Sequence, residues 1–214
     1  MAFNRAVIVT GGNVGGWIVP LLKQSDYLIG ADRGALFLVK HSRPPHLALG
    51  DFDSVSSDEL NLIQQQAGEL HQVDSIDKDW SDTELALREA IKRNYQNIVI
   101  MGGLGTRFDH SLANVHLLVQ ANEQQSNVKL VDEHNEIQLC TSELNIDADS
   151  SYPYVSLLPL SPEVTGVTLE GFRYPLHQAT LKLGWSLGVS NVLVEPYGSI
   201  HIQSGQLLVI RSRD

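Results

Sequence analysis

The sequence predicts an α/β N-terminal domain with a mostly parallel sheet, followed by an all-β C-terminal sandwich domain. Through the first half, short apolar runs alternate with stretches of helical character, which is the pattern of βαβ units. In the second half the apolar runs are short, closely spaced and separated by glycine and proline, which is typical of a β-sandwich or small barrel. We therefore expect the α/β domain over residues 1–125 and the β-sandwich over residues 126–214.

The elements of the first half follow from apolar runs that stop at glycine or aspartate. Buried strands are expected at residues 6–10, 27–30, 47–49 and 97–101. Helices are expected from the glycines at 15 and 16 through residue 22, and at residues 35–40, 57–66, 82–93 and 111–121. The stretch 82–93 has the clearest apolar face, and Asn94 is a residue type that ends helices.

The second half is expected to consist of strands. They are predicted at residues 128–131, 136–140, 154–158, 164–169, 179–183, 192–194, 199–202 and 207–210. Trp185 is interpreted as a core aromatic side chain, with a stacking platform as the alternative. Cys140 is the only cysteine, which excludes an intrachain disulfide, and we interpret it as a small buried apolar residue.

The overall charge limits the partners of the protein. The formal net charge is -10 at pH 7, which argues against a nucleic acid held mainly through its phosphates. An acidic protein that handles anionic phosphates needs cations between the two, which favours a metal-dependent site. The first residues lack the features of a signal peptide, and no apolar run approaches the length of a bilayer span. We therefore expect a soluble, cytoplasmic protein with no membrane partner.

The segment Gly50-Asp51-Phe52-Asp53-Ser54 is the strongest indication of chemistry. It follows directly on the apolar run 47–49, and open α/β sheets bind their ligands at the carboxyl ends of strands. Alternation directs Asp51 and Asp53 to the same side if the backbone stays extended through Phe52. Two converging carboxylates suit Mg²⁺, which takes one or two carboxylates together with substrate phosphate oxygens. A plain turn rich in aspartate and serine is the alternative.

Glycine or aspartate ends each expected strand of the first half. The strand ends are residues 10–12, 30–32, 50–53 and 102–105, the last including Gly102 and Gly103. In a parallel sheet these ends share one edge, where glycine lets backbone N–H groups approach phosphate oxygens. There is no Walker lysine motif and no full dinucleotide fingerprint, so these loops alone name no nucleotide-binding fold.

Charged residues precede the helix at 82–93. Lys78, Asp79 and Asp82 lie within one acidic stretch, and helix capping by Ser81 or Asp82 accounts for only part of it. Acids here are expected to join Asp51 and Asp53 in a metal site, while Lys78 neutralises a transferring phosphoryl group.

A second charged stretch follows the glycines at 102 and 103. The planar guanidinium of Arg107 is suited to hydrogen bonds with phosphate oxygens. Asp109 lies close to it in the sequence, and His110 is a further hydrogen-bond donor. In the second half, Ser190 and Asn191 form a polar break between apolar strands, which the residues alone indicate to be a hairpin turn.

Taken in order, these segments resemble the thiamine pyrophosphokinase family, whose members move a pyrophosphoryl group from ATP to thiamine. The resemblance covers nearly the whole chain. It rests on Gly30-Ala31-Asp32-Arg33-Gly34, residues 50–54, Lys78-Asp79 with Ser81-Asp82-Thr83-Glu84, Gly102-Gly103 with Arg107-Phe108-Asp109-His110 and Asn114, and Ser190-Asn191. Two departures affect substrate packing: Arg33 replaces a common glycine, and Trp185 stands where a small residue is frequent.

The resemblance implies roles for the singled-out residues. Asp51, Asp53, Asp79 and Asp82 fall at the Mg²⁺ and catalytic positions, with Lys78 beside them. The residues implied around ATP are Asp32, Arg33, Gly102, Gly103, Arg107, Asp109 and His110. Ser190 and Asn191 match the part that holds the pyrimidine end of thiamine. A homodimer with active sites shared between subunits is also implied.

Two other functions stay open at this point. Residues 47–55 mimic the strand and Asp-x-Asp-x-Val motif of haloacid-dehalogenase-type phosphatases, in which Asp51 is the nucleophile. A non-catalytic module that binds nucleotide or thiamine needs the pocket without the full set of acids. Under the kinase hypothesis, either Asp79 or Asp82 is the expected general base.

Overall fold

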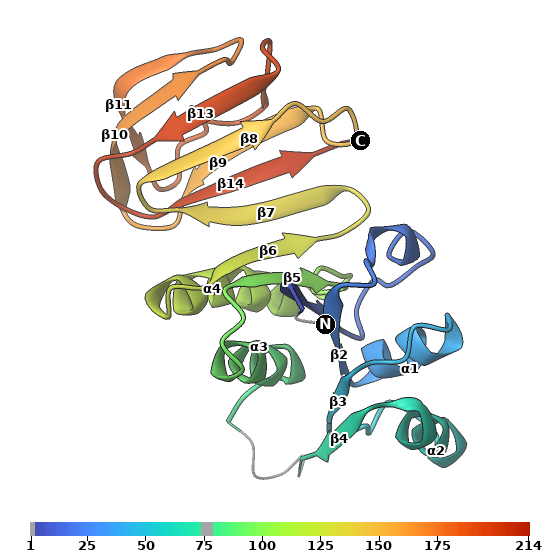
Figure 1. Cartoon of the computed structure of the whole chain (residues 1–214). Helices are drawn as coiled ribbons and strands as arrows, with labels where there is room; N and C mark the ends of the chain where they lie inside the picture. Colours follow the sequence, from blue (N-terminus) through green and yellow to red (C-terminus); the bar gives the residue numbers. More distant parts are fainter. Residues whose placement is uncertain (1–2, 74–78) are drawn as a thin grey trace. The chain divides into compact units, whose positions relative to one another are not determined.

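The chain forms two compact units, residues 1–133 and residues 134–214. The computed structural model describes residues 3–73 and 79–214 (Figure 1). The predicted boundary after residue 125 lies eight residues before this division, since 133 − 125 = 8. We call the two parts the N-terminal unit and the C-terminal unit and describe each by itself.

The N-terminal unit is built on a sheet in which each strand runs parallel to its neighbours. Its strands lie in the order β6-β5-β1-β2-β3-β4, and their pairings are parallel. The strands are β1 (Arg5–Val9), β2 (Asp26–Ala31), β3 (Leu47–Gly50), β4 (Glu69–Gln72), β5 (Asn97–Met101) and β6 (Asn127–Val131). The chain builds outward from β1 to β4 and then returns to place β5 on the other side of β1. The order therefore reverses between β1 and β5, the place where open α/β sheets form a crevice.

Helices cover both faces of this sheet. They are α1 (Arg33–Lys40), α2 (Ser57–Gln66), α3 (Asp82–Lys92) and α4 (Phe108–Glu123). The pairs α1–α2 and α3–α4 pack against each other, and Figure 1 shows the two pairs on opposite faces of the strands. Residues 6–9 of the central strand β1 are fully buried, as expected for a parallel strand covered on both sides.

Serine caps begin two of these helices. Ser56 and Glu59 form a reciprocal capping box at the start of α2, and the Ser81 hydroxyl accepts the Glu84 N–H at the start of α3. The predicted cap of α3 is therefore Ser81 and not Asp82.

The C-terminal unit is a sandwich of two antiparallel sheets. Their orders are β12-β9-β14-β7 and β11-β10-β13-β8, with antiparallel pairings throughout the described ladders. The strands are β7 (Asn135–Cys140), β8 (Glu143–Asp147), β9 (Tyr154–Pro159), β10 (Glu163–Glu170), β11 (Leu176–Lys182), β12 (Asn191–Val192), β13 (Tyr197–His201) and β14 (Leu207–Ser212). One apolar core takes residues from both sheets, and buried Cys140 belongs to it. An α/β part followed by an antiparallel sandwich is confirmed.

Several elements differ from the sequence prediction. The helix expected through residue 22 is only the 3-10 turn η1 (Val19–Leu21), which contains Pro20. The run at 128–131, predicted as part of the β-rich half, is β6 and pairs in parallel with β5. Strands β4 and β8 were not predicted. In residues 3–73 and 79–214, no helix is both long and apolar enough to cross a membrane.

Candidate functional site

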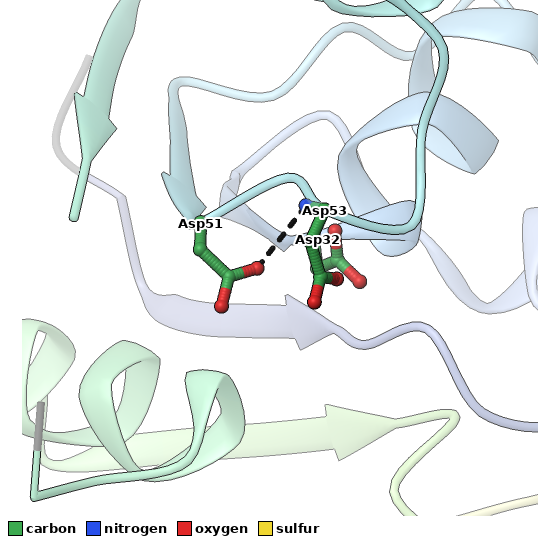
Figure 2. Close-up of side chains that lie close together, drawn as sticks. All are labelled: Asp32, Asp51 and Asp53. Atoms are coloured by element: carbon green, nitrogen blue, oxygen red, sulfur yellow. Dashed lines mark hydrogen bonds between the residues drawn. The ribbon is translucent and has the colours of Figure 1, made fainter. Parts of the chain in front are cut away.

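Three carboxylates from neighbouring strand ends converge in the N-terminal unit. Asp32 follows β2, and Asp51 and Asp53 follow β3 (Figure 2). Each offers one oxygen, and these oxygens lie within 4.8 Å of one another. Strands β2 and β3 are parallel neighbours, so their carboxyl ends meet at one edge of the sheet. We call this group the acid cluster.

A left-handed turn, and not an extended backbone, brings Asp51 and Asp53 together. Phe52 has φ of 56°, so the expected alternation through this residue is wrong. Its ring is buried in the apolar cluster beneath α1 and α2, while the Asp53 N–H donates to Asp51 Oδ1 at 3.2 Å (Figure 2). Burial of the ring is the physical reason why Phe52 adopts a backbone conformation that bulky residues avoid.

Asp32 occupies the N-cap position of α1 but does not cap the helix. Its backbone has φ of 50° and ψ of -122°, and no capping bond from its side chain is found in the described first turn. Ser54 Oγ donates to Asp32 Oδ2 at 2.5 Å. The other oxygen, Oδ1, is buried and finds no hydrogen-bond donor within the described part of the chain.

The electrostatics of the cluster favour a bound cation. Burial raises the pKa of Asp32, against the lowering effects of the Ser54 hydroxyl and the Arg33 backbone amide. The negative charges of Asp82 and Asp51 raise this pKa further. A buried carboxylate oxygen without a donor, beside two more carboxylates, matches the all-oxygen ligand set of a hard divalent cation. The residues present therefore fit Mg²⁺, which Asp32, Asp51 and Asp53 would hold.

The other predicted acids have different positions. Asp82 is the first residue of α3, and its Oδ1 faces the α-carbon of Gly50. Asp79 is exposed. Among the described residues, the group within 4.8 Å contains Asp32 and neither Asp79 nor Asp82. Lys78 lies outside the described residues.

The glycines at the ends of β1 and β5 allow these two loops to touch. A Cβ on Gly12 would lie 2.2 Å from the Gly102 carbonyl oxygen, and Gly102 itself has φ of 76°. The Thr10 N–H donates to the Met101 carbonyl oxygen at 2.9 Å. The buried Asn114 side chain donates to the Gly103 carbonyl oxygen at 2.6 Å and so fixes the loop after β5 from α4.

Arg107 and Asp109 form an exposed ion pair at the start of α4. Arg107 Nη2 lies 2.6 Å from Asp109 Oδ2, with both side chains about two-thirds exposed, at 69% and 65%. The Arg107 guanidinium lowers the pKa of Asp109 to about 2. His110 is also exposed. All three side chains are therefore open to a ligand in the described structure.

In the C-terminal unit, Ser190 and Asn191 have opposite environments. Ser190 is exposed, with φ of 61°. Asn191 is buried: its Nδ2 donates to the Tyr174 carbonyl oxygen at 2.8 Å, and its Oδ1 accepts the Tyr174 N–H at 3.1 Å. Trp185 is 70% exposed, so the interpretation as a core aromatic is wrong.

Comparison with known proteins identifies the family. The family model described as "Thiamin pyrophosphokinase, catalytic domain" matches residues 18–130, and "Thiamin pyrophosphokinase, vitamin B1 binding domain" matches residues 141–208. Thiamine pyrophosphokinase of Bacillus subtilis (strain 168) is 36% identical over 187 residues, which is 87% of this chain and 87% of that protein. The chain belongs to the thiamin pyrophosphokinase family.

Solved structures of the thiamin pyrophosphokinase family share the fold. The Bacillus subtilis thiamine pyrophosphokinase crystal structure superposes with a TM-score of 0.91 at 32% identity, covering 98% of this chain and 99% of that one. The Geobacillus thermodenitrificans thiamin pyrophosphokinase structure gives 0.87 at 31% identity, covering 98% and 97%. The acid cluster lies within the part matched by the catalytic-domain model, and Ser190 and Asn191 lie within the part matched by the vitamin B1 binding model.

Sequence reasoning missed two features of the site. Asp32 was predicted near ATP and not as a neighbour of Asp51 and Asp53, although the adjacency of β2 and β3 was a usable signal. The contact of Ser54 with Asp32 joins residues 22 positions apart, and no local pattern indicates it.

Proposed function

We infer that this chain is a thiamine pyrophosphokinase, which transfers the pyrophosphoryl group of ATP to the hydroxyl of thiamine and gives thiamine diphosphate and AMP. The observation that carries the inference is the match of both family domains, catalytic and vitamin B1 binding, along one chain. The acid cluster at the carboxyl edge of the N-terminal sheet supplies chemistry that this reaction needs.

The acid cluster is proposed to bind Mg²⁺. Asp51 and Asp53 are its first ligands, and the buried, donor-free oxygen of Asp32 supports this residue as a third. Asp79 and Asp82, predicted as ligands from the sequence, stay predictions. When bound, Mg²⁺ would supply positive charge that offsets the negative charge of the ATP phosphates.

The protein residues orient the reactants and accept a proton. The thiamine oxygen forms a bond to the β-phosphorus of ATP, while the bond from that phosphorus to the oxygen shared with the α-phosphate breaks, and AMP departs with that oxygen. Asp79 or Asp82 takes the hydroxyl proton. Positive side chains at Lys78 and Arg107 offset charge on the phosphates, and Arg33, Gly102, Gly103, Asp109 and His110 are proposed to surround ATP.

The thiamine end and the oligomeric state are further proposals. The exposed Ser190 is proposed to contact the pyrimidine ring of thiamine, with Asn191 supporting it. A homodimer with shared active sites is proposed from the family resemblance, and the C-terminal unit exposes several large apolar side chains that an interface would cover. These side chains are Tyr174, Leu183, Trp185, Leu187, Val194 and Tyr197. A cytoplasmic location stays a prediction.

One assay separates this function from its alternatives. Purified protein is incubated with ATP and Mg²⁺, with and without thiamine, and AMP and inorganic phosphate are measured. We expect AMP only when thiamine is present. Phosphate release from phosphomonoesters without thiamine would support the phosphatase, and ligand binding without either product would support the non-catalytic module.

Asp51→Asn tests the role of the acid cluster in the same assay. We expect the thiamine-dependent rate to fall about 100-fold or more, the scale on which removal of one electrostatic group lowers a rate. Asp58→Asn is the matched control, because Asp58 is an exposed acid in the first turn of α2. A fully active Asp51→Asn variant would contradict the metal role.

A further inference from the structure

We propose that Ser54 is a positioning residue, whose hydroxyl holds the Asp32 carboxylate in the acid cluster. The Oγ–Oδ2 distance of 2.5 Å is that of a charge-assisted hydrogen bond from a hydroxyl to a carboxylate. The inference rests on the proposed function, because it concerns how the acid cluster binds its cation.

The conformation of Asp32 shows why a positioning group is needed. An aspartate at a helix N-cap ordinarily accepts N–H groups of the first turn, which stabilises both partners. Asp32 makes no side-chain capping hydrogen bond in the described first turn, although the Arg33 backbone amide still lowers the pKa of its carboxyl group. Its φ is positive, in a backbone region that costs free energy for residues other than glycine. Contacts other than a helix cap therefore orient its carboxylate toward the acid cluster.

Those contacts come from the strand next to β2. The Asp32 N–H donates to the Leu49 carbonyl oxygen at 2.9 Å, which ties its backbone to the end of β3. Ser54, five residues further along the same segment, fixes the side chain through Oδ2. This division of contacts leaves Oδ1 buried and without a donor in the described structure, so one oxygen is oriented while the other stays available for a cation.

The arrangement is that of an outer-shell partner at a metal site. A group of this kind fixes the orientation of a ligand and does not touch the metal, and its removal typically lowers metal affinity about 10- to 100-fold. Ser54 is exposed, so loss of its hydroxyl removes little packing. A direct contact between Ser54 and ATP phosphate is the competing role, and it predicts a defect in nucleotide binding only.

The test compares matched serine variants of the full chain. Ser54→Ala removes the hydroxyl, Ser54→Thr keeps it, and Ser56→Ala is the control. Ser56 lies in the same loop, but its hydroxyl caps α2 by accepting the Glu59 N–H. Mn²⁺ serves as the probe because it shares the oxygen-ligand preference of Mg²⁺. Electron paramagnetic resonance measures the concentration of unbound Mn²⁺ directly. Binding is measured without nucleotide, and melting temperature and thiamine-dependent AMP release are recorded for every variant.

We expect the Mn²⁺ dissociation constant of Ser54→Ala to rise about 10- to 100-fold, with values near wild type for Ser54→Thr and Ser56→Ala. Ser56→Ala is expected to lower the melting temperature because a helix cap is lost. Unchanged Mn²⁺ affinity in Ser54→Ala would overturn the proposal. If, at the same time, the KM for ATP rises, Ser54 contacts the nucleotide directly instead. If wild-type protein releases no AMP with thiamine, the proposed function itself fails, which is a separate result from a failure confined to Ser54→Ala.

Discussion

The α-carbon of Gly50 faces the Asp82 carboxylate so closely that a Cβ at position 50 would lie 3.3 Å from Asp82 Oδ1. The same Cβ would lie 3.3 Å from the Asp32 backbone nitrogen, and Gly50 has φ of 138°. Three segments of the site therefore meet at Gly50, a residue without a side chain: the ends of β2 and β3 and the start of α3. This packing explains why the residue before Asp51 is glycine.

Gly50→Ala is expected to impair both stability and activity. The strained φ alone costs about 1–3 kcal/mol of unfolding free energy, and the methyl group displaces Asp82 or Asp32. Urea unfolding measures the first effect, and thiamine-dependent AMP release measures the second. Gly166→Ala is the control, because Gly166 in β10 also has a positive φ, of 65°, and the three atoms nearest to an added Cβ there, at 2.7–2.8 Å, belong to the Gln203 side chain and not to the acid cluster. Equal losses of activity in the two variants would contradict a specific role of the Gly50 contact.

The sequence predicted buried elements well and exposed ones poorly. Strands β1 and β5 have apolar runs because helices cover both faces of the sheet, and such runs are legible without a structure. Strand β4 (Glu69–Gln72) has a mostly exposed sequence, and it is a strand only because its backbone pairs with β3. That pairing depends on the fold, so no local pattern indicates an edge strand of this kind.

Only the part of the site that lies at strand ends was predictable from the sequence. Asp51 and Asp53 follow a buried strand, and the rule for parallel sheets placed them at the ligand edge. The turn at Phe52 contradicts the local preference of an aromatic residue, because tertiary burial of its ring decides its backbone conformation. Asn191 was implied by the resemblance to lie in the part that holds thiamine, and no local pattern indicates that its side chain bonds the Tyr174 backbone in the structure.

Substitutions at Ser190 and Asn191 are expected to separate binding from stability. Asn191→Ala removes the side-chain partners of the part-buried N–H and carbonyl groups of Tyr174, which costs about 1–3 kcal/mol of unfolding free energy. Ser190→Ala removes an exposed hydroxyl and is expected to change stability by less than about 0.5 kcal/mol while raising the KM for thiamine. Chemical unfolding and thiamine titrations check both statements. A stable Asn191→Ala protein with weakened thiamine binding would mean that the amide acts on substrate directly.

Arg107→Ala is expected to weaken ATP binding without loss of stability. The Arg107 side chain is 69% exposed and pairs with the exposed Asp109, and such surface pairs contribute little to folding. A charge-assisted bond to phosphate is stronger, so the KM for ATP should rise about tenfold or more. Lys40→Ala is the matched control, since Lys40 also forms an exposed pair, with Glu59 at 2.8 Å. A rise of similar size in Lys40→Ala would indicate a nonspecific charge effect.

His46 is expected to make stability depend on pH. Its Nδ1 accepts the Leu28 N–H at 2.9 Å, and its ring stacks on Tyr27 with centroids 4.9 Å apart. Burial, with a smaller contribution from the positive charge of Arg43, lowers the pKa of His46 below its ordinary value of 6.5. The unfolded chain therefore binds the proton more readily than the folded protein. The contribution of neutral His46 is complete above pH 6.5 and is lost as the pH falls from there toward the lower folded pKa.

His46→Asn tests this dependence because asparagine keeps an acceptor oxygen near the position of Nδ1 but does not titrate. We expect the variant to be less stable than wild type at pH 8, since the stacked ring is lost, and its unfolding free energy to vary less between pH 7 and about pH 5.5. Urea unfolding at half-unit pH steps gives both curves, with the exposed His177→Asn as the control. Since His177→Asn leaves the Leu28 bond intact, it should keep the wild-type slope. A slope in His46→Asn as steep as in wild type would assign the pH dependence to other groups.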